Sequence, residues 1–346
     1  MNQNIKIPFV DLYPQYEEIK TEIDLAITDI IDRSDFVTGR TEDKFERAIA
    51  QYTGAEDCAS VGSGTSALIC ALKALDVGPG DEVLTVGHTF VATTEAIVSV
   101  GAKPVFVDID DYYHFDLEPC KKFEEIYLEL NPPKAILFVD LYGQTPDIDK
   151  IKKFAKKYKI KVIEDAAQSF GSSYKGKKVG SIVDLTCFSF NPVKNLGAMG
   201  NAGAVTGSKK LVDRVRMYRN HGRKTKVEAE TVGYNTRIDN LQAVILQAKL
   251  KKIDEWLEKK RKICRRYTDE LKDIVKCPKE TPWSYHTYYV YVIETPKGTR
   301  DALQKYLREK GIATKIHYES PTHSMKAFKN EYTEKLPKTE YICNNV

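Results

Sequence analysis

The sequence lacks the features of membrane proteins and secreted proteins. No apolar run approaches the roughly 18 residues that span a membrane, and the first residues have no apolar core followed by a cleavage site. The formal net charge is only +4, from 53 basic and 49 acidic residues dispersed along the chain, which argues against nucleic-acid binding. We therefore expect a cytoplasmic protein that binds neither membranes nor nucleic acid.

Paired cysteines and paired histidines are also missing. The seven cysteines are scattered, odd in number and without a CxxC pair, which is typical of reduced thiols in a cytosol rather than of a disulfide framework. The six histidines lack the paired spacing of metal ligands. We expect no disulfide framework and no metal site.

What the sequence does have is an alternation of strand-like and helical segments through its first two thirds. Short, nearly continuous apolar runs between helical patterns are typical of a mostly parallel sheet that helices cover on both faces. The expected strands are residues 58–61, 83–86, 104–107, 135–139, 161–163 and 185–190. The pattern predicts an α/β fold, with an amphipathic helix directly after Gly64.

The pattern changes from Asp239 onward. Apolar residues at helical spacing continue from residue 241 to residue 267, which predicts one long helix. The elements expected after it are a strand at 285–293, a helix at 299–310 and a strand at 313–318. We therefore divide the chain into a large domain, residues 1–240 with an N-terminal arm, and a smaller α+β domain, residues 241–346.

Two polar side chains stand where such a sheet places its chemistry. Asp165 follows the apolar run at 160–163 and Lys194 follows the run at 185–190, near the carboxyl ends of strands, where open α/β sheets bind ligands. A lysine that forms a Schiff base with pyridoxal 5'-phosphate (PLP) needs a partner acid for the ring nitrogen of the cofactor. The pair predicts a PLP enzyme in which Lys194 and Asp165 are catalytic. The structural alternatives are a helix N-cap for Asp165 and a surface lysine after a proline turn for Lys194.

A glycine-rich segment, Gly62-Ser-Gly-Thr-Ser66, lies between a short apolar run and a helix. Backbone N–H groups at a helix N-terminus attract anions, so this segment is expected to bind the cofactor phosphate. The residues assigned to that role are Gly64, Thr65 and Ser66.

With Ala67, the same segment also fits the dinucleotide fingerprint GxGxxG/A. That interpretation requires an acid at the end of the next strand, whereas Asp81 and Glu82 precede the run at 83–86. A nicotinamide enzyme would also leave the lysine and its partner acid unexplained. A P-loop is excluded because no Gly-Lys-Ser/Thr follows the glycines.

Further blocks, in this order, make the chain similar to the sugar aminotransferases of the DegT/StrS group, which are PLP enzymes of fold type I. The blocks include Pro8-Phe-Val-Asp-Leu-Tyr-Pro-Gln-Tyr16, Gly62-Ser-Gly-Thr-Ser-Ala67, Gly78-Pro-Gly-Asp-Glu-Val83, Leu141-Tyr-Gly-Gln144, Arg219-Asn-His-Gly222 and Gly233-Tyr-Asn-Thr-Arg-Ile-Asp239. Members of this group continue past the equivalent of residues 336–340, so the resemblance implies a small domain truncated at Val346.

The resemblance adds cofactor and substrate residues to those that the pattern predicts. It implies that Gln168 contacts the ring hydroxyl, that Ser189 binds the phosphate and that Phe90 stacks on the ring. Asn235 matches an asparagine that the neighbouring subunit contributes to the phosphate, which implies a homodimer with shared active sites. The residues expected on the substrate side are His221, Arg237, Tyr318 and His323.

Two departures from the pattern of the group lie beside the cofactor residues. The usual Gly-Asp-Gly-Gly is Gly200-Asn-Ala-Gly203 here, and Asn191 stands before Pro192 where the group often has Tyr or His. We expect these positions to influence the choice of substrate more than the transamination itself.

The function implied by the resemblance is amination of a nucleotide-linked keto-sugar, with L-glutamate as donor, for lipopolysaccharide or other glycan biosynthesis. The block Lys194-Asn-Leu-Gly-Ala198 is more similar to members that act on a 3-keto group than to those that act on a 4-keto group. Amination of a 4-keto-sugar or of a free cyclitol stays open, as does the choice among UDP, dTDP and GDP. A dehydratase of the same fold would carry histidine at the lysine position, and a PLP-binding regulator without turnover would not need the intact pair.

Overall fold

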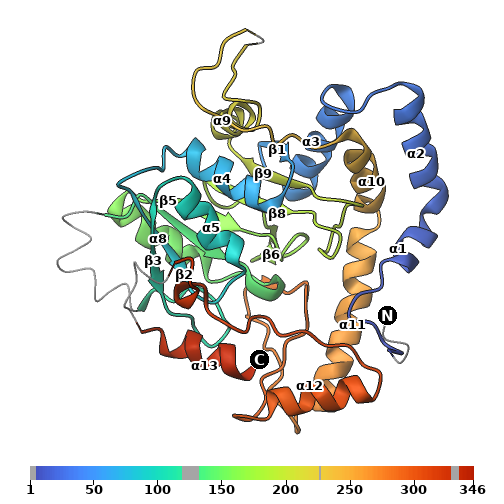
Figure 1. The fold of residues 1–346 in the computed structure, drawn as a ribbon, viewed down its shortest axis with the longest axis vertical. Helices are drawn as coiled ribbons and strands as arrows, with labels where there is room; N and C mark the ends of the chain where they lie inside the picture. Colours follow the sequence, from blue (N-terminus) through green and yellow to red (C-terminus); the bar gives the residue numbers. More distant parts are fainter. Residues whose placement is uncertain (1–4, 119–131, 226, 329–334) are drawn as a thin grey trace.

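A seven-stranded sheet forms the centre of the computed structural model, which describes residues 5–118, 132–225, 227–328 and 335–346 (Figure 1). Its strands are β1 (Asp57–Val61), β2 (Glu82–Val86), β3 (Lys103–Val107), β4 (Ala135–Val139), β5 (Lys161–Asp165), β8 (Leu185–Ser189) and β9 (Gly203–Gly207). The order across the sheet is β1-β9-β8-β5-β4-β2-β3. Within this sheet β9 is antiparallel to both of its neighbours, and the other neighbouring pairs are parallel. The predicted mostly parallel sheet is confirmed.

Helices cover both faces of the sheet, which explains why its strands are apolar almost throughout. On one face lie α4 (Gly64–Ala74), α5 (Val91–Ser99) and α9 (Lys209–Arg219), and they pack in one cluster with strand residues such as Leu137 and Ile163. On the other face α8 (Ile148–Tyr158) packs in a cluster with Ile136 and Phe138. Residues 135–138 of β4 therefore enter the two cores alternately, as the period of two requires.

A third apolar cluster joins β1, β8 and β9 to three further helices. These helices are α3 (Arg40–Thr53), α10 (Asn240–Leu250) and α11 (Ile253–Leu271). The N-terminal helices α1 (Tyr13–Glu18) and α2 (Lys20–Asp32) lie outside them, where Ile23 packs with Ile245 of α10. Figure 1 shows α11 running from this layer towards the C-terminal part of the chain.

The single long helix expected at 241–267 is wrong. The chain forms α10 and α11, which are separated by a turn at Lys251 and Lys252. Leu246 of α10 and Ile253 and Leu257 of α11 belong to one apolar cluster. Because the apolar spacing continues through the turn, the sequence pattern does not reveal it.

The two strands expected after these helices are also wrong. Only Ser284–Tyr285 forms a strand, β10, and 313–318 has no strand ladder. The amides of Thr287 and Tyr289 donate instead to the carbonyls of Gly143 and Tyr142. Residues 285–293 are thus hydrogen-bonded to an irregular loop. The alternation of apolar residues does not show whether such a segment pairs with a loop or with a strand.

The remaining elements complete the C-terminal part. The helix predicted at 299–310 is confirmed as α12 (Arg300–Glu309), and α13 (Pro337–Asn345) packs Ile342 into the α8 side of the sheet. The small elements are a three-stranded sheet of β10, β6 (Ser173–Tyr174) and β7 (Lys177–Lys178), and the 3-10 turns η1 (Leu141–Gly143) and η2 (Thr322–Ser324). The division of the chain at residue 240 stays a prediction.

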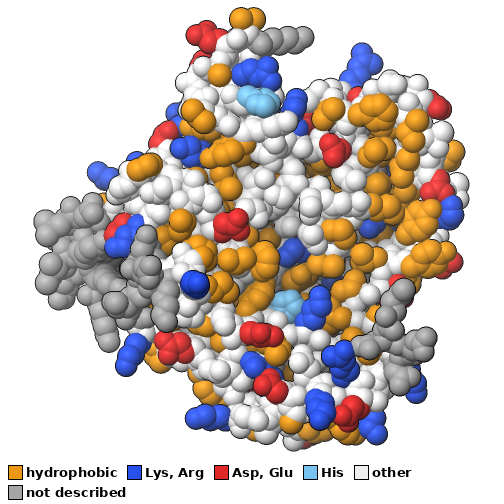
Figure 2. All heavy atoms as spheres, in the orientation of Figure 1, with side chains coloured by type: hydrophobic (Ala, Val, Ile, Leu, Met, Phe, Trp, Pro, Cys, Tyr) orange, Lys and Arg blue, Asp and Glu red, His pale blue; other side chains and the backbone are white. Residues whose placement is uncertain are grey.

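The surface over α1 and α2 is markedly apolar. Figure 2 shows hydrophobic side chains gathered on this side of the molecule, and Tyr13, Leu25 and Ile31 are more than half exposed there. In the described part of the chain, no helix combines the length and the apolar character needed to cross a membrane.

Candidate active site

The predicted site residues follow the carboxyl ends of four strands. The glycine-rich segment follows β1, Phe90 follows β2, Asp165 ends β5 and Ser189 ends β8. In the sheet, Val61 pairs with Gly203 of β9, which pairs in turn with Ser189. The β1 loop and the end of β8 are thus brought to the same edge, where parallel strands present their ligand-binding loops.

The N-terminus of α4 lies directly against the end of β8. A Cβ atom added to Gly64 would stand 2.6 Å from the Cβ of Ser189, a distance that only glycine avoids. Ser63 caps the helix, and its hydroxyl accepts a 3.1 Å hydrogen bond from the amide of Ser66. Amide groups of the first turn, the hydroxyls of Thr65 and Ser66 and that of Ser189 can therefore face one anion. This arrangement fits a phosphate group.

Asp165 is a buried carboxylate whose negative charge is only partly compensated. Its oxygens accept hydrogen bonds from the hydroxyl of Thr93 (2.8 Å) and the amide of Ala167 (3.2 Å). Burial raises the pKa of Asp165, and these two bonds and the charge of Lys194 act in the opposite direction. A protonated ring nitrogen would supply the missing positive charge, so the environment of Asp165 fits a pyridine cofactor.

Lys194 lies in the loop after β8, with its Nζ 4.4 Å from the centre of the Tyr289 ring. Burial lowers the pKa of Lys194 from 10.5 to about 8, against the opposing effect of Asp165. About a tenth of the amine is then neutral at pH 7, far more than for an exposed lysine. The next residue anchors the loop, because the side-chain nitrogen Nδ2 of Asn195 donates to the carbonyl of Phe170 and to the hydroxyl of Thr287.

Gln168 and Tyr318 close the site on another side. The Gln168 oxygen accepts from the amide of Tyr142 (2.8 Å), and its nitrogen donates to the hydroxyl of Tyr318 (2.9 Å). The ring of Tyr318 is 6.1 Å from that of Phe90, whose side chain is 53% exposed and so presents a free aromatic face. The contact of Gln168 with a ring hydroxyl stays a prediction.

The structure does not bring every predicted residue to Lys194. Among the described residues, buried His323 contacts Phe106, at 5.7 Å between rings, and Glu340, at 3.9 Å. Its ring also lies against Gly87, directly after β2. Within the described ranges, no contact joins it to Lys194.

Three other predicted residues lie on the segment after α9, which projects from the body of the molecule (Figure 1). His221 and Asn235 are exposed there, and the Asn235 oxygen accepts from the guanidinium of Arg237 at 2.9 Å. No contact in the described part of the chain joins them to Lys194. The segment is nevertheless tied to the glycine-rich loop, since the amide of Gly62 donates to the carbonyl of Thr236 at 2.8 Å.

Sequence reasoning missed three neighbours of the site. Thr93 could be predicted from the sequence, because it lies one helical turn after Phe90. Tyr289 was assigned to a strand that does not form. The pKa of His317 is lowered by burial and by the charge of Lys194. His317 stands next to the predicted residue Tyr318, but no role at the lysine is predicted for it.

Comparison with known proteins adds the following. The profile of the DegT/DnrJ/EryC1/StrS aminotransferase family matches residues 17–346. The "Pleiotropic regulatory protein" of Geobacillus stearothermophilus is 41% identical, over 97% of this chain and 91% of the relative. The "UDP-N-acetyl-3-dehydro-alpha-D-glucosamine 3-aminotranferase" of Acidithiobacillus ferrooxidans is 37% identical, over 100% of this chain and 93% of the relative.

Among solved structures, S. venezuelae DesV in complex with a ketimine intermediate is similar with a TM-score of 0.93. It is 34% identical, and the match covers 98% of this chain and 91% of that one.

Proposed function

This chain belongs to the DegT/DnrJ/EryC1/StrS aminotransferase family, and from that premise we propose that it aminates the 3-keto group of a nucleotide-linked sugar, with L-glutamate as the amino donor. It is an aminotransferase, and its cofactor is PLP. The observation that carries the proposal is the pairing of Lys194, with a pKa of about 8, and buried Asp165 at one edge of the sheet.

Bound PLP supplies an electron sink for the carbon that gains or loses the amino group. Lys194 would hold the cofactor covalently, and its Nζ, once released, would move the proton at the substrate carbon. Asp165 would keep the ring nitrogen protonated, with Thr93 holding its carboxylate in place. The first turn of α4 and Ser189 would bind the phosphate, and Phe90 would pack against the ring.

Two observations support a sugar acceptor aminated at position 3. The relative from A. ferrooxidans is named a 3-aminotransferase of a UDP-linked sugar and matches the whole of this chain. The block from Lys194 to Ala198 is similar to that of members acting on a 3-keto group. Tyr318, whose hydroxyl accepts a hydrogen bond from Gln168 at 2.9 Å, and the adjacent His317 would contact the sugar acceptor.

A homodimer is the assembly that fits this function. Asn235 is exposed, and no contact in the described part of the chain joins it to Lys194, so its predicted role at the phosphate fits a neighbouring subunit. The apolar surface over α1 and α2 supplies a face that a second copy could cover.

A regulator without turnover is the second candidate, because one relative carries the name of a regulatory protein. The retained lysine, its partner acid and the phosphate cradle favour the enzyme. The two candidates differ in whether an amino donor changes the bound cofactor.

The test is the visible absorption spectrum of the purified protein with PLP, before and after addition of L-glutamate. We expect L-glutamate to bleach the visible absorption band of PLP that is bound to the lysine. We expect Lys194→Ala to bind PLP without forming that band. The bleached enzyme should then aminate a nucleotide-linked 3-keto-sugar. A band that no amino donor changes would favour the regulator, and amination of only 4-keto-sugars would refute the assigned position.

A further inference from the structure

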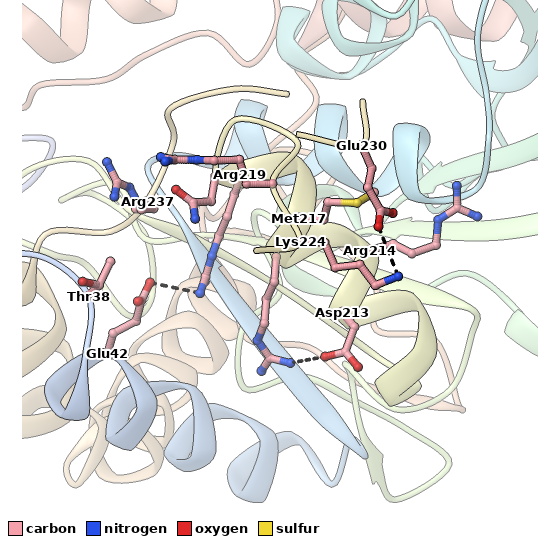
Figure 3. A pocket seen from close by; sticks show the side chains of 12 residues that line it. Thr38, Glu42, Asp213, Arg214, Met217, Arg219, Lys224, Glu230 and Arg237 are labelled. Atoms are coloured by element: carbon pink, nitrogen blue, oxygen red, sulfur yellow. Dashed lines mark hydrogen bonds and ion pairs between the residues drawn. The ribbon is translucent and has the colours of Figure 1, made fainter. Parts of the chain in front are cut away.

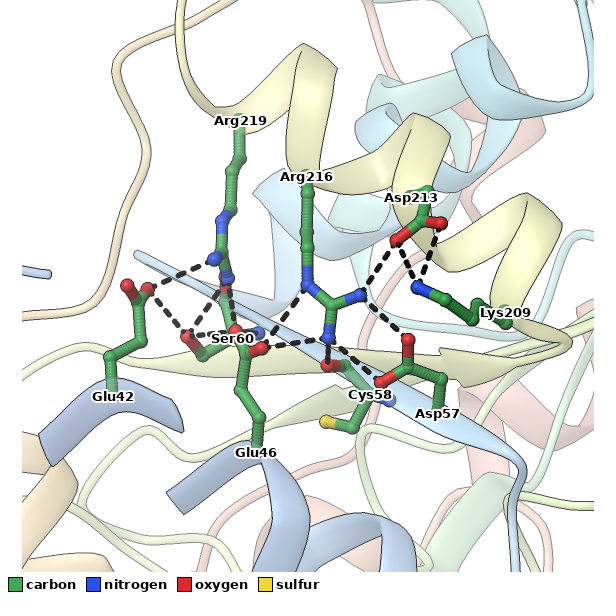
Figure 4. Close-up of polar contacts among 9 residues, drawn as sticks. All are labelled: Glu42, Glu46, Asp57, Cys58, Ser60, Lys209, Asp213, Arg216 and Arg219. Carbon is green, nitrogen blue, oxygen red and sulfur yellow. Dashed lines mark hydrogen bonds and ion pairs between the residues drawn. The ribbon is translucent and has the colours of Figure 1, made fainter. Parts of the chain in front are cut away.

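The strand β1 lies at an edge of the sheet, because only β9 pairs with it in the described part of the chain. Backbone groups on its other side have no neighbouring strand, and proteins cover such edges. Side chains of α3 and α9 cover this one (Figure 4). The guanidinium of Arg216 donates to the carbonyl of Cys58 at 2.6 Å. The carboxylate of Glu46 accepts from the amide of Ser60 at 2.8 Å, and the carbonyl of Ser60 accepts from Arg219.

These side chains belong to a cluster of charges between α3, β1 and α9. Its centre is buried, since Glu42, Glu46 and Arg219 are each less than a tenth exposed. Arg219 pairs with Glu46 and also with Glu42 at 3.2 Å, and Figure 3 shows the latter two side chains directed toward one another. Arg216 pairs with Glu46 (2.9 Å) and Asp57 (2.6 Å). Removal of either arginine would leave carboxylates without a partner, so both are expected to stabilise the fold.

Arg219 differs from Arg216 in a second contact, which leads to the glycine-rich loop. The backbone carbonyl of Arg219 accepts from the amide of Thr236 (3.0 Å), and the carbonyl of Thr236 accepts from the amide of Gly62 (2.8 Å). Gly62 comes two residues after Ser60, whose hydroxyl accepts from the side chain of Arg219 at 3.0 Å. These hydrogen bonds and the backbone between Ser60 and Gly62 close a ring.

The ring holds the first residue of the glycine-rich loop in a tight place. A Cβ atom added to Gly62 would stand 3.0 Å from the side-chain oxygen of Thr236. Two residues later, Gly64 begins α4 and lies against Ser189. The loop is thus fixed on one side by α9 and on the other by the end of β8. Groups that bind a ligand must be held to within about 0.5 Å of their working positions, so both supports matter for an anion at the first turn of α4.

We propose that Arg219 is a positioning residue for the cofactor phosphate, and that it acts by fixing the glycine-rich loop against α9. The inference rests on the proposed function, because it takes this loop as the phosphate cradle of PLP. Loss of the Arg219 side chain opens the ring at Ser60, and the loop can then move relative to α9. Arg216 donates to Cys58, which lies outside the ring, so its loss leaves the ring closed.

The test compares Arg219→Met with Arg216→Met by fluorescence titration of the cofactor-free protein with PLP. Both substitutions remove one guanidinium from the same cluster and one hydrogen bond to a carbonyl of β1, so both should lower the temperature of unfolding. We expect Arg219→Met to raise the dissociation constant of PLP about tenfold, as the loss of one hydrogen bond to a charged group does. Arg216→Met is the matched control and should change the constant less than twofold.

Arg219→Lys separates the position of the loop from the charge of the cluster. An ammonium group keeps the positive charge beside Glu42 and Glu46 but lacks the planar fork of a guanidinium. The temperature of unfolding should therefore return close to that of the wild type, while the dissociation constant of PLP stays about threefold or more above it. The phosphorus NMR signal of bound PLP, which does not depend on turnover, should shift in both Arg219 variants and keep its wild-type position in Arg216→Met.

An equal effect of Arg219→Met and Arg216→Met on PLP binding would overturn the inference, because the cluster would then act through stability alone. If Arg219→Met does not fold, Arg219→Lys decides: wild-type affinity and an unshifted phosphorus signal would refute the positioning role. Weaker binding in Gly64→Ala but not in the Arg219 variants would leave the cradle intact and exclude Arg219. Failure of the proposed function is seen separately, as PLP binding that depends on Arg219 in a protein that aminates no keto-sugar.

Discussion

At the scale of single residues, the site depends on a lysine and a carboxylate whose burial opposes their charged forms. Burial lowers the pKa of Lys194 and raises that of Asp165, while each charge favours the other. Thr93 adds a hydrogen bond to the charged form of the carboxylate. The lowered pKa of Lys194 leaves part of its amine neutral near neutral pH, which is what an enzyme that forms a bond between lysine and a carbonyl requires.

The pKa of Lys194 gives the first prediction. The neutral amine of Lys194 attacks the carbonyl of PLP. The neutral fraction of this amine rises with pH, most steeply around its pKa of about 8. The rate at which the cofactor-free protein forms its visible band should therefore increase from pH 6 to about 8 and level off above pH 9. Stopped-flow absorbance measures it, with Lys194→Ala as the control that forms no such band. A rate that still rises steeply at pH 10, as for an exposed lysine, would refute the lowered pKa.

At the scale of elements, the phosphate cradle is a contact between the first turn of one helix and the last residue of one strand. Ser189 ends β8, and α4 begins at Gly64, the position that lets the two approach. Helix N-termini attract anions only over the first turn. A small displacement of α4 from β8 should therefore weaken phosphate binding while the rest of the sheet is unchanged.

Gly64→Ala tests this contact. The added methyl would meet the Cβ of Ser189 at 2.6 Å, and relief of such overpacking typically costs about 1–3 kcal/mol. We expect the dissociation constant of PLP to rise about tenfold or more, as measured by fluorescence titration of the cofactor-free protein. Gly78→Ala is the control, because its methyl would meet nothing nearer than a carbonyl oxygen at 3.8 Å. Equal effects of the two substitutions would contradict the cradle.

The elements also show what the sequence predicts well and what it does not. The strands β1, β2, β3, β4, β5 and β8 follow from short apolar runs, because both faces of each strand are buried. The turn between α10 and α11 escapes prediction, since Leu246 and Ile253 enter the same core on either side of it. Residues 285–293 alternate as a strand does, yet Thr287 and Tyr289 bond to the η1 loop.

The same distinction holds for the candidate site. Asp165 and Ser189 could be predicted because they end strands, and the ends of parallel strands meet at one edge of a sheet. Tyr289 and His317 come from segments without regular structure, so their approach to Lys194 depends on the folding of the whole chain.

At the scale of the whole molecule, the exposed segment after α9 carries predicted site residues that have no contact with Lys194 of the same chain among the described residues. Asn235 is exposed, and Thr236 beside it is bonded to the glycine-rich loop of its own chain. In a homodimer, this segment would contact one site through its backbone and the neighbouring site through its side chains.

Mixed dimers test this arrangement. Chains with Lys194→Ala and chains with Asn235→Ala, unfolded together and refolded, should form heterodimers in which one of the two sites has both intact residues. We expect that mixture to recover about a quarter of wild-type turnover, while each parent alone has little. Activity equal to the average of the parents would show that Asn235 acts within its own chain or has no role at the cofactor.

The pairing of β1 has a consequence for the order of events during synthesis on the ribosome. In the described sheet, β1 is an edge strand that pairs only with β9, some 140 residues later in the chain. The loop after β1 also meets Ser189 and Thr236, which are likewise synthesised late. A nascent chain that ends before residue 203 has therefore made its glycine-rich loop but has no strand to hold it. We therefore expect cofactor binding to follow completion of the sheet, and contacts between residues so far apart in sequence to make that completion slow.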